Sequence, residues 1–545
     1  MKFSESDPTP QKDSTPRGPR GTRRLILLPA FLSVVALLAI WVGVEKYLSD
    51  SETVSSLLFE SWDMLSIEGV RVGGSHTRQW QADQDGQLRK ITESTEYLRV
   101  LRQGQSIYLE VTYRCEETPA GELLACSSRQ QTNDGPMIVQ TAQVVGDQLQ
   151  LQQQMASSQS TRSIEWPNHA RGYFGIEESL RQQMLVPDER RTLKYLVPLV
   201  NQLAEVDLHA GQFEAIELTA GLTRLLRIEV TTRRAGLTSH RTLWCDGAGA
   251  VIRSFEPTMK ITSEQTSREV AQWHSPMPHY DIMVDSLVPI DPPIGTPLEQ
   301  SELVYQVQLR DDSPAEIFAQ DDRQKVESLN NRQALLSVRA AWLKKGVRTL
   351  LPELPGGYFA QKSPDPFFQP EAANLAPSHY IQSDDPQIIA LAERVSLDTE
   401  AAGKGPLALG LERLVHDWIH DKDLQQVFAS ARDVCESRRG DCTEHAVLLA
   451  AVCRARKLPA RLVVGLIYVP EQQGFLFHLW TEVWWDQHWH GLDATMGRGG
   501  IGATHLKLHA FTLANDNPLA DMAAVSQVIG QLEIEVVESG ELRVE

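Results

Sequence analysis

An uninterrupted apolar run near the N-terminus, from Leu25 to Val44, most constrains what this chain can fold into. The run has no charge and a single hydroxyl, Ser33. About 20 apolar residues in a helix span the hydrocarbon core of a bilayer. Pro29, near one end, is tolerated in such helices. The sequence therefore predicts a transmembrane helix over residues 25–44, after a basic tail over residues 1–24.

The charges on either side of this run predict its orientation. Basic residues gather before it, whereas acidic residues dominate beyond Lys46. By the positive-inside rule, the tail stays in the cytoplasm and the rest of the chain lies on the extracytoplasmic side, as a periplasmic domain in a bacterium. A cleaved signal peptide is the alternative, but the run is long and no small-residue cleavage site follows it. We expect a single-pass membrane protein.

The charge and the cysteines limit the partners and the cross-links. The formal net charge of −19 argues against a nucleic-acid partner, because phosphate binding needs a basic face. Cys115 and Cys126 are equidistant from the turn-forming pair Ala120-Gly121, so a hairpin centred there would place them opposite each other. An exported protein can oxidise such a pair to a disulfide. Two unpaired strand cysteines are the equal alternative.

Residues 60–270 are predicted to form a large antiparallel β-rich domain. Apolar residues alternate with polar ones, as in Ile107 to Tyr113, and Asp-Gly pairs such as Asp246-Gly247 mark tight turns. Short strands with frequent turns indicate a sheet that curves into a part-closed barrel. The stretch from Glu177 to Val206 is predicted to be helical and to interrupt this sheet.

The pattern changes several times after residue 270. We expect a proline-rich linker (271–300), a small β unit (301–350), a second proline-rich linker (351–383), a catalytic domain (384–515) and a C-terminal helix and strand extension (516–545). In the catalytic domain, Asp385-Pro386 begins a helix. Helices there precede a strand at Ala460 to Val469 and a hairpin at Phe477 to Thr495, which makes the fold class α+β.

The first residue of one predicted helix, Cys442, is a candidate nucleophile. Asp441 fits the N-cap position and Glu444 lies three residues later, which is a capping box. The helix N-terminus favours a thiolate through its unpaired N–H groups. The carboxylates of Asp441 and Glu444 oppose this effect. A reactive thiolate at this position therefore needs an imidazole partner as well.

The predicted hairpin offers that imidazole and a carboxylate to orient it. His478, Trp480 and Glu482 share one face of a strand. If Asp486-Gln487 forms a two-residue turn, Asp493 lies opposite Trp480, and His478 is its diagonal neighbour on the same face. A carboxylate beside the ring would fix its tautomer and stabilise an imidazolium. A register slip of one residue would reverse this conclusion.

Three separated segments of the catalytic domain, GDCTEHA, KLPARLVVGLIYV and HLWTEVWWDQHWHGLDAT, resemble the core signature of the transglutaminase-like superfamily. The resemblance covers about residues 385 to 500. It implies a papain-like fold, with Cys442 as nucleophile, His478 as general base and acid, and Asp493 as orienting carboxylate. Some relatives need calcium, but no acidic loop with calcium-binding spacing is present, so we expect no cofactor and no metal.

Several neighbours of the triad are expected to support it. His445 and Glu482 are predicted to support or pack against the site, and Trp480 to form a pocket wall. The backbone N–H of Cys442 can supply one oxyanion donor. Candidates for the second donor are Trp418, Gln425 and Gln426. A zinc site made of Cys435, Cys442, His445 and Cys453 is disfavoured by its spacing.

The expected reaction is acyl transfer through a Cys442 thioester on protein or peptide amides. An amine as second nucleophile gives a cross-link, whereas water gives deamidation or peptide hydrolysis, and these outcomes remain open. Because members of this superfamily include peptidases and amidases, a cysteine peptidase or amidase is one alternative. A non-catalytic cell-envelope binding or assembly protein with a degenerate module is the other. The natural substrate and the oligomeric state stay open.

Overall fold

The computed structural model describes residues 54–84, 86–102, 104–133, 137–155, 158–219, 221–234, 237–272, 280–281, 286–310, 312–344, 347–348, 369–396, 403–422, 428–514, 525 and 527–537. All of them belong to one compact unit, Val54–Glu545. The predicted transmembrane helix over residues 25–44 lies outside these ranges. Within them, no helix has both the length and the apolar character needed to cross a membrane.

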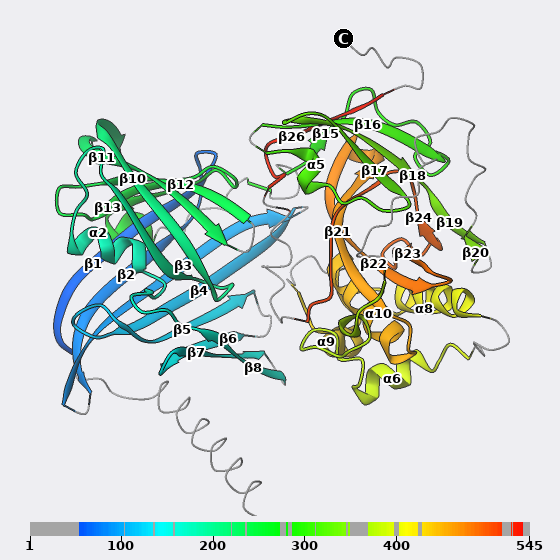
Figure 1. Cartoon of the computed structure of the whole chain (residues 1–545), viewed down its shortest axis with the longest axis horizontal. Helices are drawn as coiled ribbons and strands as arrows, with labels where there is room; N and C mark the ends of the chain where they lie inside the picture. The colour runs from blue at the N-terminus through cyan, green and yellow to red at the C-terminus, as the bar shows by residue number, and fades with distance from the viewer. Residues whose placement is uncertain are drawn as a thin grey trace, which may run out of the picture. The chain divides into compact units, whose positions relative to one another are not determined.

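The N-terminal half of the described chain forms one antiparallel sheet of 14 strands (Figure 1). Its strands are β1 (Val54–Ile67), β2 (Val70–Gln84), β3 (Gln87–Arg102), β4 (Gln105–Glu117), β5 (Leu123–Thr132), β6 (Ile138–Val145), β7 (Gln148–Met155), β8 (Ser158–Glu165), β9 (Arg190–Val197), β10 (Gln202–Leu218), β11 (Gly221–Arg234), β12 (Leu237–Cys245), β13 (Val251–Glu256) and β14 (Ile261–Thr266). Except for β8 and β9, strands that follow one another pair as hairpins, and β1 pairs with β14. The predicted large antiparallel sheet is therefore present, with β8 and β9 at its two ends.

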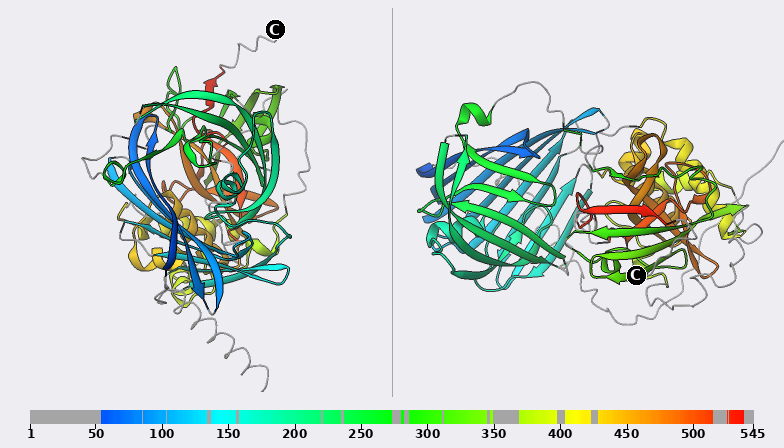
Figure 2. Two further views of the ribbon diagram at one scale, coloured as in Figure 1. Left: turned by 90° about the vertical axis from the view of Figure 1, so that its left-hand side faces the viewer. Right: turned by 90° about the horizontal axis from the view of Figure 1, so that it is seen from above.

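The sheet curves around a short helix, α2 (Gly175–Gln182) (Figure 2). Ile176 and Leu180 of this helix are buried in a core with side chains of β10, β11 and β12. On β4, Val111 and Tyr113 are buried in a second core, as their alternation predicts. Both apolar clusters hold the concave face of the sheet together.

The two cysteines predicted to face each other do so. Cys115 on β4 pairs directly with Cys126 on β5. Both side chains are buried free thiols, and burial raises the pKa of Cys115 well above its ordinary value. A disulfide between the two stays a prediction.

The helix predicted from Glu177 to Val206 is wrong over most of its length. It ends at Gln182, and the chain continues as β9 and β10, which pair from Gln202↔Val197 to His209↔Arg190. Pro187 removes a helical hydrogen-bond donor, and Asp188 adopts a positive φ of 66°. Pairing between neighbouring strands thus outweighs the local helical pattern.

The C-terminal half contains three smaller sheets. The largest has the order β15 (Val288–Pro289), β22 (Gly474–Trp485), β21 (Ala460–Val469) and β25 (His505–Phe511), with β23 (His488–Leu492) paired to β22. A second has the order β17 (Gln324–Asn330), β18 (Gln333–Arg339), β16 (Glu302–Leu309) and β26 (Leu532–Val536). The third joins β20 (Val347–Arg348), β19 (Ala341–Lys344) and β24 (Gly500–Ile501). Side chains of the first two sheets share one core, which includes Val307, Leu336, Leu466 and Phe475.

Helices cover the other side of the first of these sheets (Figure 1). These helices are α6 (Pro386–Ala392), α8 (Lys404–Trp418), α9 (Ala431–Ser437) and α10 (Cys442–Ala455). Of the shorter helices, α3 (Arg268–Ala271) packs against β1 and β2, and α5 (Pro314–Ile317) packs against β16, β17 and β18. The two 3-10 helices are η1 (Ala372–Asn374) and η2 (Pro470–Gln472). As predicted, Asp385 caps α6 and Pro386 is its first residue. Helix α10 is the central one, because its residues from Glu444 to Arg454 are all buried. This arrangement is α+β.

Candidate active site

Cys442 is the first residue of α10, and the predicted capping box is confirmed. Oδ1 of Asp441 accepts a hydrogen bond from the Thr443 amide at 2.8 Å, and Oε2 of Glu444 accepts one from the Asp441 amide at 3.0 Å. Cys442 is only partly buried, whereas the helix from Glu444 to Arg454 is buried. The sequence thus positions a partly accessible thiol at the positive end of a helix dipole.

The two carboxyl groups beside this thiol oppose a thiolate less than the sequence indicates. Burial, followed by the charge of Asp441, raises the pKa of Glu444 well above its ordinary value. The raised pKa reduces the negative charge that Glu444 places beside the thiol. The Asp441 carboxylate has a cationic partner, because its Oδ2 lies 2.5 Å from the Arg102 guanidinium on β3. The positive charge of Arg102 offsets the negative charge nearest the thiol.

The predicted hairpin register is also confirmed. Trp485 pairs with His488, so Asp486 and Gln487 form the two-residue turn, each with a positive φ. The pairing continues to Thr481↔Leu492. Extended by one position beyond the end of β23, this register places Asp493 opposite Trp480 and leaves His478 diagonal to Asp493 on the same face.

This register brings the three predicted triad residues together. Nε2 of His478 lies 2.9 Å from Oδ2 of Asp493, and the Cys442 side chain is close enough to the His478 ring to raise its pKa. The His478 and Asp493 side chains are 8% and 1% exposed. Oδ1 of Asp493 accepts a further hydrogen bond from the Thr495 amide at 2.9 Å.

The electrostatics of this group favour an imidazolium. Burial alone would lower the pKa of His478, but the charge and hydrogen bond of Asp493, together with Cys442, raise it well above its ordinary value. Burial would raise the pKa of Asp493, but the charge of His478 and hydrogen bonds from His478 and His505 hold it far below. Asp493 is therefore an ionised acceptor, and His478 Nε2 carries the proton between them.

Two predicted neighbours pack against the triad. The Nδ1 atom of His445 donates to the carbonyl of Asp441 at 2.5 Å, and burial lowers the pKa of His445. This neutral ring braces the first turn of α10. The indole of Trp480 is 1% exposed and stacks on the His478 ring, with centroids 6.4 Å apart. Both residues restrict the positions that Cys442 and His478 can adopt.

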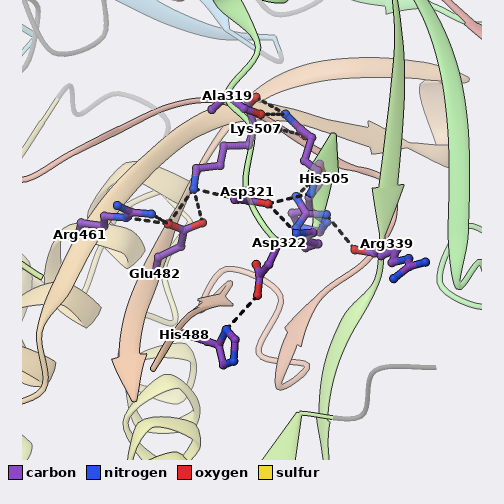
Figure 3. A network of polar contacts seen from close by, with 11 residues as sticks. Ala319, Asp321, Asp322, Arg339, Arg461, Glu482, His488, His505 and Lys507 are labelled. Atoms are coloured by element: carbon purple, nitrogen blue, oxygen red, sulfur yellow. Dashed lines mark hydrogen bonds and ion pairs between the residues drawn. The ribbon is translucent and has the colours of Figure 1, made fainter. Parts of the chain in front are cut away.

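Glu482 lies on the same face of β22 as His478 but belongs to a separate ion-pair network (Figure 3). Its carboxylate accepts hydrogen bonds from Arg461 Nε and Lys507 Nζ, each at 2.8 Å. Lys507 Nζ also donates to Asp321 at 3.0 Å. Burial would raise the pKa of Glu482, but Lys507 and Arg461 lower it. The ion pairs of Glu482 therefore link strands β21, β22 and β25. Asp321 connects the same network to a loop that lies far earlier in the sequence.

The candidates for a second oxyanion donor have different outcomes. The prediction of Trp418 is wrong, because its indole N–H donates to the carbonyl of Cys435 at 3.0 Å and is not available to a substrate. Gln425 and Gln426 lie outside the described residues. Cys442 itself is at the first helical position, where the backbone N–H has no partner within the helix.

One contact of the triad was not predicted. Nε2 of His505 on β25 lies 3.3 Å from the same Asp493 oxygen that His478 bonds. Among the described residues, one group has potential metal-ligand atoms that all lie within 4.8 Å of one another, and it consists of His478, Asp493 and His505. The two hydrogen bonds to Asp493 account for this spacing. No motif in the sequence marks His505, which only a strand pairing brings to Asp493.

Comparisons with known proteins agree with part of this picture. A family model described as the transglutaminase-like superfamily matches residues 402–494. No curated protein matches the chain. Among solved structures, a candidate cysteine protease of Cytophaga hutchinsonii is 17% identical, covering 43% of this chain and 85% of its own, with a TM-score of 0.28.

Two further solved structures are similar to this chain. A β-barrel-like protein of a domain of unknown function from Brucella abortus is 8% identical, covering 39% of this chain and 97% of its own, with a TM-score of 0.30. A candidate protease of Parabacteroides distasonis is 12% identical, covering 73% of this chain and 65% of its own, with a TM-score of 0.17. These low scores carry no argument, so the assignment rests on the family model. The segment matched by the model of the transglutaminase-like superfamily, residues 402–494, contains Cys442, His478 and Asp493.

Proposed function

We propose that this chain is a thiol acyl-transfer enzyme that acts on protein or peptide amides through a thioester at Cys442. The observation that carries the proposal is the position of His478, whose ring bonds Asp493 at 2.9 Å and lies close enough to Cys442 for that side chain to raise its pKa. A thiol, an imidazole and a buried carboxylate in this order form an activated nucleophile.

The first half of the reaction forms the thioester. The Cys442 thiolate attacks the carbonyl carbon of the amide, and the backbone N–H of Cys442 donates to the developing oxyanion. The C–S bond forms and the C–N bond breaks. The proton on the His478 imidazolium moves to the departing nitrogen, which leaves as a neutral amine or as ammonia.

The second half releases the acyl group. Neutral His478 removes a proton from an incoming nucleophile, which attacks the thioester carbonyl as the C–S bond breaks. Cys442 returns as a thiolate beside the imidazolium. A primary amine gives a new amide, whereas water gives a carboxylic acid. Asp493 holds the ring in one tautomer throughout.

We further propose that the enzyme acts on the extracytoplasmic side of a membrane, anchored by residues 25–44. The support is the uncharged apolar run and the basic residues before it. Added protease should therefore cleave the catalytic domain on the outside of intact cells or spheroplasts, and leave an epitope at the N-terminus intact. Cleavage of the N-terminal epitope alone would contradict this orientation.

The test of function uses the full chain with a glutamine-containing peptide, with and without a labelled primary amine. Mass spectrometry should find the acyl group on Cys442 at short times, and ammonia or amine should be released at the same rate. Incorporation of the labelled amine would identify a transferase, and a free acid alone would identify a hydrolase. A panel of internal peptide bonds tests the peptidase alternative. Cys442→Ser, which keeps the side-chain volume, is the matched control. If no peptide or amide acylates Cys442, the non-catalytic binding protein becomes the better account.

A further inference from the structure

Asp493 receives hydrogen bonds from two histidines rather than one. Oδ2 lies 2.9 Å from Nε2 of His478 and 3.3 Å from Nε2 of His505. All three side chains are buried, and His505 is 2% exposed. An ionised carboxylate only accepts hydrogen bonds, so both Nε2 atoms must carry protons. Asp493 is thus held from two sides, by one histidine that meets the thiol and one that does not.

The tautomer of His505 follows from this geometry. With the proton on Nε2, the neutral ring has a lone pair on Nδ1. Among the described residues, Nδ1 of His505 has no hydrogen-bond partner. A positive charge on this ring would require a second buried N–H donor with no acceptor and would repel the nearby His478 imidazolium. His505 therefore acts as a neutral donor of one hydrogen bond.

The backbone on both sides of His505 is held by a distant segment of the chain. The buried Arg323 guanidinium donates to the carbonyl of His505 at 2.6 Å and to that of Gly502 at 3.2 Å. Two residues later, Lys507 is bound through its side chain to Asp321 and through its amide to Gln324. Figure 3 shows this network around β25. The ring of Trp480 packs edge-on against His505, with centroids 5.6 Å apart.

We propose that His505 is a positioning residue: its Nε2–H holds the Asp493 carboxylate in the orientation that His478 needs. This inference rests on the proposed function of Cys442. His505 and the segment over residues 319–324 both lie outside the matched family segment, residues 402–494. They form a support for the catalytic carboxylate that the matched segment does not itself contain.

The test separates hydrogen bonding from packing by two substitutions at one position. In His505→Gln, the amide nitrogen reaches about as far as Nε2 and can donate to Asp493, whereas His505→Leu fills space without a donor. The measurement is the rate of Cys442 alkylation by iodoacetamide in the full chain, at pH 6 and at pH 9, with thermal melting as the folding control. His509→Gln and His509→Leu, at an exposed position of the same strand, are the matched controls.

We expect His505→Leu to slow alkylation at pH 6 by about tenfold or more, as for loss of a hydrogen bond to a charged group. It should change the pH 9 rate little, because a free thiol is already ionised there. His505→Gln should stay within about threefold of the wild type, in line with a retained hydrogen bond.

Equal losses in both variants, with unchanged melting, would overturn the donor role, and so would wild-type rates in both. If either variant fails to melt as a folded protein, the donor role is judged on His505→Asn and His505→Phe, which repeat the comparison of a donor with an apolar side chain. If the wild type itself alkylates slowly at pH 6, the proposed function fails and this inference with it. Fast wild-type alkylation that the variants leave unchanged overturns the role of His505 alone.

Discussion

The Nε2 atom of His478 lies 2.9 Å from Oδ2 of Asp493, so Nδ1 is the ring nitrogen left to meet Cys442. This relationship assigns a separate task to each side of the imidazole. One nitrogen is fixed as a donor to a buried carboxylate, and the other exchanges a proton with sulfur and substrate. The first prediction tests this division.

Asp493→Asn should lower the catalytic rate by about 10³ to 10⁴, because an amide in place of the carboxylate can hold the ring in the wrong tautomer. The rate of amide turnover and the rate of Cys442 alkylation at pH 6 should fall together. Asp417→Asn, at an exposed position on α8, is the control and should change neither rate. A nearly active Asp493→Asn variant would mean that His478 does not depend on this carboxylate.

Arg102→Ala should slow Cys442 alkylation at pH 6 by roughly tenfold, the size of effect that one nearby charge has on an ionising group. Without the guanidinium, the Asp441 carboxylate is unpaired beside the thiol and disfavours its ionisation. Arg102→Lys should recover part of the rate, since it restores a positive charge. Removal of the exposed Arg99 on the same strand serves as the control. Identical rates for Arg102→Ala and Arg99→Ala would exclude this electrostatic role.

The folded Glu412→Gln variant should lose less stability than the wild type as the pH is raised. Burial, followed by the charge of Asp493, raises the pKa of Glu412 to about 8, and its Oε1 accepts the Gly499 amide at 3.2 Å. Because the folded pKa is raised, the unfolded chain releases its proton first as the pH rises. The stabilising contribution of Glu412 is complete below about pH 4.5 and is lost as the pH rises through about 8.

Glu412 alone can change the free energy of unfolding by at most about 1.4 kcal/mol per pH unit. Thermal melting of wild type and Glu412→Gln between pH 5 and pH 8 measures it. The melting temperature of Glu412→Gln, relative to that of the wild type, should increase as the pH rises. Parallel curves would show that Glu412 has an ordinary pKa.

Lys507→Met should destabilise the folded protein by about 3 kcal/mol or more. The substitution removes the buried ammonium group that pairs with the carboxylates of Glu482 and Asp321. Chemical denaturation followed by tryptophan fluorescence measures the change. Combining Lys507→Met with Glu482→Gln should cost less than the two separate effects added together. Lys404→Met, at an exposed position, should have almost no effect. An equally small effect at Lys507 would mean that the network does not stabilise the sheet.

Features set by neighbouring residues could be predicted from the sequence. The capping box of Asp441 and Glu444 and the turn at Asp486-Gln487 depend on a few adjacent residues, and both have the predicted geometry. That turn sets the register of the hairpin, which explains why the sequence alone predicts that His478 and Asp493 share one face. A short hairpin leaves few other choices of pairing.

Features set by distant contacts could not be predicted. His505 reaches Asp493 only because β25 pairs with β21, and Arg323 joins β25 from a segment about 180 residues earlier. The stretch from Arg190 to Val197 has no local signal that outweighs its helical pattern, and it is a strand because β10 lies beside it. The indole N–H of Trp418 is not free for a substrate, because the carbonyl of Cys435 accepts its hydrogen bond. In each case a partner outside the local sequence decides the outcome.

The pH dependence of Cys442 alkylation tests the central claim most directly. The full chain is treated with iodoacetamide from pH 4 to pH 9, the labelled peptide is identified, and His478→Ala is treated in parallel. The account predicts fast labelling of Cys442 below pH 7, because the imidazolium of His478 stabilises the thiolate, and a marked slowing in His478→Ala. Labelling that rises only near the pKa of a free thiol, about 8.5, or that is the same with and without His478, would contradict the account.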